Sequence, residues 1–265
     1  MRLLARRKGE LEREAGVPPR GEPPMHTTDS NHGKVNRALL ACGLAAGPLY
    51  VVVGAVEAVT REGFDPTRHD LSLLANGKWG WIHIALLVTS GMLTALGAVG
   101  MRQAMGGGRG GTWGPLLLGV YGAGLVGAGI FVADPMNGFP SGLPAGAYGD
   151  VSWHGMLHIV FGGVGFLGLI AACFVFARRF AALGERGWAR FSAATGVIYF
   201  AAFFGIAAGS QQGGTVLTLV VLAFTVAVVL AWAWISAVAA RLLRGWKGRK
   251  RDSGAYGSAN MRRIR

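Results

Sequence analysis

Charged residues and cysteines are scarce in this sequence. Only 15% of its 265 residues are charged, whereas 52% are hydrophobic. An average soluble domain has roughly 25% charged residues, so an ordinary water-soluble protein is excluded. The two cysteines, Cys42 and Cys173, lie in separate apolar stretches near their predicted cytoplasmic ends. We therefore expect no structural disulfide and treat both cysteines as apolar side chains.

Several sequence motifs of catalysis and nucleotide binding are absent. The chain contains no Walker loop, dinucleotide fingerprint, CxxC pair or serine nucleophile elbow. Its 44 glycines follow no three-residue period, which excludes collagen. The net charge of +13 is concentrated in short stretches between long apolar runs, so no nucleic-acid partner is expected.

Six of these apolar runs contain no Lys or Arg. A helix needs about 20 apolar residues to cross a bilayer, because every backbone polar group must be paired where water is absent. The six segments that meet this requirement are 38–59, 79–101, 112–133, 153–177, 191–209 and 215–240. The sequence therefore predicts an all-α, polytopic membrane protein with six transmembrane helices.

The basic residues predict the orientation of these helices. Lys and Arg are retained on the cytoplasmic side of a membrane, and all of them except Arg61, Arg68 and Lys78 fall in the two tails and in the second and fourth loops. Both termini are thus expected in the cytoplasm, with outer loops at 60–78, 134–152 and 210–214. The tails, 1–37 and 241–265, are predicted to be basic and solvated. Residues 1–37 are expected to be disordered, and 241–265 is expected to begin as the end of a basic helix and then become disordered. Met25 is an alternative start to Met1.

Polar residues inside the spans gather at the outer ends of the first four helices. Ionisable groups in a membrane are costly and are functional candidates for that reason. Residues three, four or seven apart share a helix face, which turns these groups into the bundle beside small residues. With the first outer loop, they form a predicted outward-facing pocket. Its candidate residues are Glu57, Arg68, Asp70, Ser72, His83, Asp134, His154 and His158.

Two local expectations follow from the same reading. Asp65-Pro66 resembles a helix cap and first helical position, and Asn76-Gly77 resembles a helix stop. A short helix lying on the membrane surface is therefore expected between them. In the third span, Gly119, Ala123 and Gly127 share one face, which we expect to pack against the centre of the bundle.

His154 and His158 have the spacing of two ligands of a divalent metal. Asp134 or His83 could supply a third ligand, so a zinc ion is a possible cofactor. A hydrolase of lipid esters or amides would then use Asp134 or Glu57 as the base for a metal-bound water. The zincin motif is absent, because Gly155 stands where its glutamate would be.

Other interpretations of the same residues stay open. The pocket could bind a membrane lipid or another amphiphile, which is our preferred interpretation. The histidines and carboxylates could relay protons, or Glu57, His83 and His158 could simply pair with one another in a structural protein without a void. His154 could also belong to an interfacial aromatic belt beside Trp153. The basic C-terminal cluster could contact anionic lipid heads or serve only as a topology signal. Protein partners are not predicted.

The order of several motifs resembles a bacterial family of multi-pass membrane proteins, the domain of unknown function 998. The resemblance covers roughly residues 38–240. It implies six helices, the bacterial cytoplasmic membrane and no established activity, and it adds weight to Ser72, Asp134 and His158 but not to His83. A Ser, an Asp and paired His in a membrane are also loosely similar to ceramidase-like hydrolases, which have seven helices. The motifs that carry the family resemblance are Arg61-Glu62-Gly63-Phe64-Asp65, Leu71-Ser72-Leu73-Leu74, Gly129-Ile130-Phe131 before Asp134-Pro135, Gly138-Phe139-Pro140, and Trp153-His154-Gly155-Met156-Leu157-His158.

Overall fold

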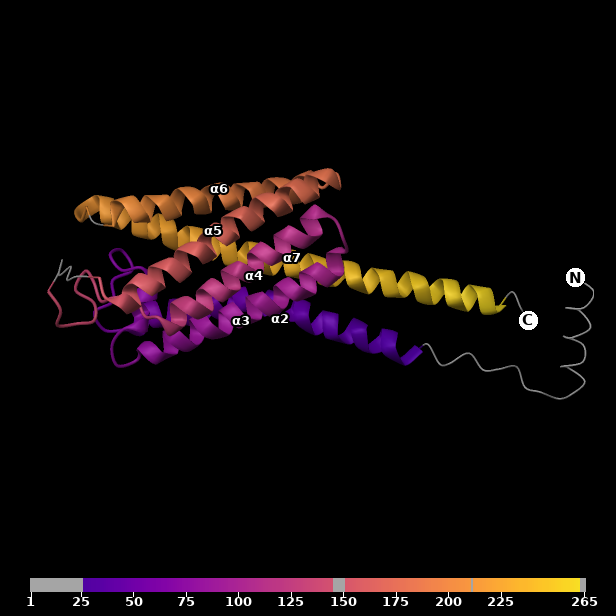
Figure 1. The fold of residues 1–265 in the computed structure, drawn as a ribbon, viewed down its shortest axis with the longest axis horizontal. Coiled ribbons are helices and arrows are strands. Elements are labelled where there is room, and N and C mark those ends of the chain that lie inside the picture. Colours follow the sequence, from indigo (N-terminus) through magenta and orange to yellow (C-terminus); the bar gives the residue numbers. More distant parts are fainter. Residues whose placement is uncertain (1–25, 145–150, 211, 263–265) are drawn as a thin grey trace, which may run out of the picture. The chain divides into compact units, whose positions relative to one another are not determined.

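The structure is a computed structural model that describes residues 26–144, 151–210 and 212–262. Over these residues it contains long helices, one short 3-10 helix and no strand (Figure 1). The elements are α2 (His26–Thr60), η1 (Leu71–Ala75), α3 (Gly80–Met105), α4 (Arg109–Ile130), α5 (Trp153–Ala182), α6 (Arg186–Gly209) and α7 (Gly214–Arg262).

All six long helices include a stretch that is long and apolar enough to cross a membrane. This confirms the predicted six-helix membrane fold, and the chain is an integral, multi-pass membrane protein. The stretches are Gly33–Thr60, Gly80–Met105, Arg109–Ile130, Trp153–Ala182, Arg186–Gly209 and Gly214–Gly245.

Several helices extend beyond their predicted ends. α2 begins at His26 and α7 continues to Arg262, so the described parts of both predicted tails are helical rather than irregular. Residues 1–25, which include the alternative start at Met25, lie outside the described residues. Basic side chains do not stop a helix at a membrane surface, because their long stems let the charge reach water while the backbone stays helical.

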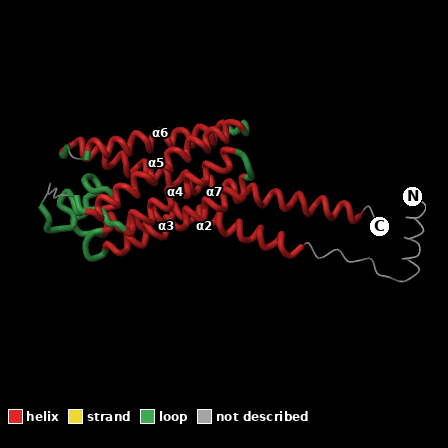
Figure 2. Tube along the Cα trace, viewed as in Figure 1, coloured by secondary structure: helices red, strands yellow, loops and turns green. Residues whose placement is uncertain are grey.

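The loops gather at the two ends of the helix bundle (Figure 2). Short connections at 106–108 and 183–185 join α3 to α4 and α5 to α6. The segments that follow α2, α4 and α6 lie at the other end, which we call the pocket end. α4 packs against both α3 and α5, and α6 packs between α5 and α7.

Glycines allow the closest helix crossings. A Cβ atom placed on Gly124 of α4 would lie 2.7 Å from Cα of Gly165 in α5, and one on Gly97 of α3 would lie 2.5 Å from Cα of Gly43 in α2. Without a hydrophobic drive between helices in lipid, such close contact is what holds spans together.

The predicted packing face of α4 is only partly correct. Gly127 packs against a ring of α5, but a Cβ on Gly119 would meet no atom within 4 Å and Ala123 is exposed. Packing glycines on α4 instead include Gly122 and Gly124. A helix with small residues on several faces does not reveal from its spacing which face meets its neighbours.

Candidate functional site

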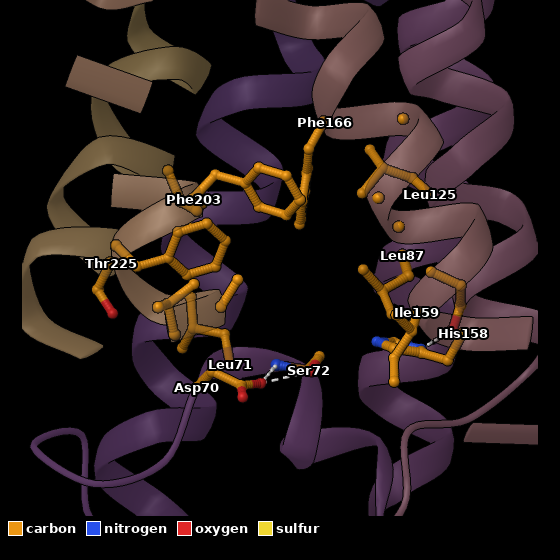
Figure 3. Close-up of a pocket in the computed structure, with 18 of the residues that line it drawn as sticks. Asp70, Leu71, Ser72, Leu87, Leu125, His158, Ile159, Phe166, Phe203 and Thr225 are labelled. Carbon is orange, nitrogen blue, oxygen red and sulfur yellow. Dashed lines mark hydrogen bonds between the residues drawn. The ribbon is translucent and has the colours of Figure 1, made fainter. Parts of the chain in front are cut away.

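A cavity of about 440 Å³ lies inside the bundle toward the pocket end. Its volume is in the range of sites that hold small organic ligands. Figure 3 shows its polar residues Asp70, Ser72 and His158 at one end, and Phe166, Phe203 and Leu125 farther along it. All six long helices contribute to its wall, with residues that include Tyr50, Leu87, Leu125, His158, Phe203 and Val228.

Asp70 and Ser72 reach the cavity from the first of the loops. Asp70 caps η1. Its Oδ1 accepts hydrogen bonds from the backbone N–H of Ser72 (3.1 Å) and from the hydroxyl of Ser72 (2.5 Å). The cap turns the carboxylate toward the cavity, where both residues are part of the lining. No described residue of the lining is Lys or Arg, so the one formal charge at this wall is negative.

His158 is held by the main chain of α4. Its Nδ1 lies 2.9 Å from the carbonyl oxygens of both Ala128 and Phe131, to which only an N–H can donate. In the neutral ring the proton is therefore on Nδ1, and Nε2 is an acceptor. The side chain is half-buried and lines the cavity, so the site has an oriented acceptor opposite Asp70.

Aromatic rings form the deeper wall. Phe166 of α5 packs edge-to-face against Phe203 of α6 and Phe224 of α7, with ring centroids 5.5 and 5.6 Å away. Tyr50 and Tyr121 complete this wall and both pack against Trp232. The cavity thus has a carboxylate and an imidazole at the end near the loops and a largely aromatic wall toward the middle of the spans.

The two longer loops cover this end of the bundle together. Leu73, Leu74 and Phe139 form a small hydrophobic core of their own at 1%, 0% and 1% exposure. His69 connects the loops, since its Nδ1 accepts from the backbone N–H of Asp65 (2.9 Å) and its Nε2 donates to the carbonyl of Asn137 (3.0 Å).

The short helix of the first loop differs from the prediction. It begins after Asp70 rather than after Asp65, and its Leu73 and Leu74 are buried instead of facing a membrane surface. Asp65 caps a separate turn: the hydroxyl and the backbone N–H of Thr67 donate to its carboxylate and hold its pKa below the ordinary value. Arg68 is exposed and is not part of the cavity lining.

Glu57 and His83 form a buried pair beside the cavity. Nδ1 of His83 lies 2.8 Å from Oε2 of Glu57. His83 is 0% exposed and Glu57 is 4% exposed. Arg61 lies 3.4 Å from the other carboxylate oxygen and donates to the carbonyl of Asn76. Tyr50 separates this pair from the cavity, with its ring edge-on to that of His83 at 6.3 Å.

The interpretation as a purely structural protein predicted that His158 would pair with Glu57 and His83 and that no void would lie beside them. Only the Glu57–His83 pair forms, whereas His158 bonds to α4 carbonyls and lines a cavity. Glu57 and His83 are therefore paired, whereas His158 faces open space.

Asp134 holds Ser152, the residue that caps α5. Its two carboxylate oxygens accept from the backbone N–H (2.8 Å) and the hydroxyl (2.5 Å) of Ser152, whose Oγ in turn accepts from the N–H of Gly155. A Cβ on Gly155 would lie 2.0 Å from a carboxylate oxygen of Asp134. Position 155 is therefore glycine because a larger residue would collide with Asp134. Its identity needs no explanation from the zincin motif.

The expected metal ligands do not come together. No group of three His, Cys, Asp or Glu that could hold a metal ion occurs among the described residues. Asp134 accepts from Ser152, and His158 turns Nδ1 to the backbone. His154 is exposed, and its ring lies tilted against that of Trp153 with 3.5 Å between centroids. The residues present do not fit a zinc site, and we derive no hydrolytic step from them.

We predict that Asp134→Ala lowers the unfolding free energy by about 1–3 kcal/mol, since the backbone N–H and the hydroxyl of the capping residue Ser152 lose their charged acceptor. Thermal unfolding in detergent, with and without a chelator, measures this. His154→Ala should leave the unfolding free energy unchanged, because the His154 side chain is exposed. If the chelator destabilises the wild type but not the Asp134→Ala variant, Asp134 is a metal ligand and the interpretation as a metal site is correct.

Sequence reasoning missed most of the cavity wall. Phe166, Phe203 and Phe224 resemble lipid-facing residues when only their spans are known. A usable signal was present in the tyrosines Tyr50 and Tyr121, because a phenol in the middle of a span, away from the interface, needs a polar surrounding for its hydroxyl.

The comparisons with known proteins agree with the fold. The family model described as "Protein of unknown function (DUF998)" matches residues 44–241, which includes every residue of the cavity. Neither the curated proteins nor the solved structures gave a match.

Proposed function

Because the chain belongs to the DUF998 family, whose function is unknown, we propose a role from the site alone: the protein binds an amphiphile in the cavity of its bundle. The observation that carries this proposal is the cavity itself, about 440 Å³ in volume, with Asp70, Ser72 and His158 at one end and aromatic side chains farther along it (Figure 3). A headgroup is accommodated beside Asp70, Ser72 and His158, and an apolar tail lies along the aromatic wall.

The burial pattern favours binding over a purely structural role. Glu57 and His83 contact each other and do not line the cavity. By contrast, the cavity wall combines a carboxylate, an imidazole acceptor and aromatic rings around open space. A few placed polar groups in a mostly apolar concave wall are typical of ligand sites.

We further propose that the cavity faces the outside of a bacterial cytoplasmic membrane, with both termini in the cytoplasm. The distribution of Lys and Arg supports this orientation. At the pocket end, Trp79, Trp81 and Trp153 are 51%, 60% and 65% exposed, as side chains at the headgroup level are. The polar end of the cavity would then lie at the depth of the lipid headgroups.

Native mass spectrometry of the purified protein tests the proposal. We expect the wild type to retain an amphiphile as a mass adduct and Thr225→Phe to lose it, because the ring would occupy the cavity. The Thr225 hydroxyl bonds only within its own helix, to Val221, so its loss leaves little unpaired. Gly119→Phe, in open space away from the lining, is the matched control. A wild type without adduct, or equal adducts in all three proteins, would contradict the proposal.

A further inference from the structure

The cavity also opens sideways, between α5 and α6. Ile159 of α5 belongs to its lining and is 60% exposed, and Ala207 of α6 is likewise both lining and exposed. On α5, about one turn from Ile159, a Cβ on Gly162 or Gly163 would meet no atom within 4 Å, although both glycines line the cavity. The wall is therefore incomplete along this side of the bundle.

The opening lies where α5 and α6 diverge toward the pocket end (Figure 1). At the far side of the cavity, a Cβ on Gly196 of α6 would lie 3.0 Å from Cβ of Cys173, so the helices are in contact there. Nearer the pocket end, the rings of Phe166 and Phe203 keep them apart, with centroids 5.5 Å from each other. At Gly163 no side chain fills the remaining space.

The surroundings of the opening are apolar. Val160 and Val164 on α5 and Phe204 on α6 are 48%, 54% and 47% exposed, and all lie within stretches able to span a membrane. A gap flanked by such side chains opens into hydrocarbon and not into water.

We infer that the ligand is a lipid of the bilayer that enters sideways between α5 and α6 and places an amine headgroup at Asp70. This rests on the proposed function and names its ligand class. The headgroup is assigned by charge, since Asp70 offers a carboxylate and His158 an acceptor nitrogen, while no described lining residue is Lys or Arg. An amine donates to both groups, whereas a bare phosphate or carboxylate would meet only repulsion from Asp70.

Photolabelling in vesicles tests the route of entry. The protein is placed in phosphatidylcholine vesicles with a long-chain primary amine that carries a diazirine at the end of its chain. We expect labels on peptides of α5 and α6 around the cavity, displaced by unlabelled amine. Gly163→Phe should lower the label formed at short times about tenfold, because the ring fills the gap. Gly119→Phe adds the same ring where a Cβ is also free but no cavity lies, and should label within twofold of the wild type.

A second labelling experiment tests whether the headgroup is an amine. A fatty acid with the same chain and diazirine should label about tenfold less than the amine, which is the effect of one charge-assisted contact. Asp70→Asn should abolish this preference, and asparagine still caps η1 because it is a good capping residue. A fatty acid that labels as well as the amine would overturn the amine assignment.

The outcomes separate this inference from the proposed function. If Gly163→Phe labels as fast as the wild type while unlabelled amine still competes, the lateral route is wrong and amphiphile binding stands. If no cavity peptide is labelled although the purified protein carries a native adduct, the lipid amine is wrong and binding again stands. Should Gly163→Phe fail to fold, Ile159→Trp obstructs the same opening from an exposed position and is read in the same way.

Discussion

Replacing His83 with alanine is expected to lower the unfolding free energy by about 3–5 kcal/mol, as breaking a buried ion pair does. His83 is completely buried and bonds to Glu57 at 2.8 Å. Without the imidazole, the carboxylate keeps only the longer contact to Arg61 at 3.4 Å. The penalty is thus mainly that of an incompletely paired carboxylate inside a membrane span.

Denaturant unfolding in mixed micelles measures this loss, and a double-mutant cycle gives its origin. The Glu57→Met/His83→Leu protein removes both partners and should regain part of the stability, because no carboxylate is left buried, while Arg61 keeps its bond to the carbonyl of Asn76. If the double substitution instead costs the sum of the two single ones, Glu57 and His83 are not coupled and the pair has been misassigned.

Gly124→Leu is expected to prevent close packing of α4 and α5 and to cost more than the about 1–3 kcal/mol that is usual for overpacking. A Cβ at this position would already lie 2.7 Å from both Cα of Gly165 and the carbonyl oxygen of Phe161. These are backbone atoms, which cannot rotate away as a side chain can. The helices would have to separate, and the contacts on both sides of the crossing would be lost with them.

Gly119→Leu is the matched control, because it puts the same side chain on the same helix where a Cβ meets no atom within 4 Å. We expect it to stay within about 0.5 kcal/mol of the wild type, as is usual for exposed substitutions. Thermal unfolding and monodispersity in detergent compare the two variants. Equal stability of both would show that α4 and α5 do not cross at Gly124.

The helical fold was predictable because the membrane restricts the choice. Where no water can pair the backbone, a long apolar stretch has to be a helix, and this condition needs only the local sequence. The ends of the helices were less predictable, since basic residues at a membrane surface are compatible with helix and coil. η1 was misplaced because Asp65 and Asp70 are both good caps, and only tertiary contacts of Leu73 and Leu74 selected Asp70.

The site was predictable in part. Helical spacing correctly turned His158 toward the bundle interior, and loop composition suggested Asp70 and Ser72. Spacing could not show that Asp134 bonds to Ser152, because a carboxylate that holds a capping residue and one that binds a metal look the same in a sequence. Nor could it show that His83 takes Glu57 as its partner rather than facing the ligand.

Taken alone, the sequence determined that this chain is a six-helix membrane protein whose titratable groups gather toward one end, because burial of the backbone in lipid and the cost of charge there are properties of each segment by itself. Only the tertiary structure decided which of those groups pair, which cap a helix and which face a cavity. That choice depends on the close contact of α5 with α4 at Gly124 and on the open space beside Gly163. The distance between two helices depends on both of them, so the sequence of one helix does not determine it.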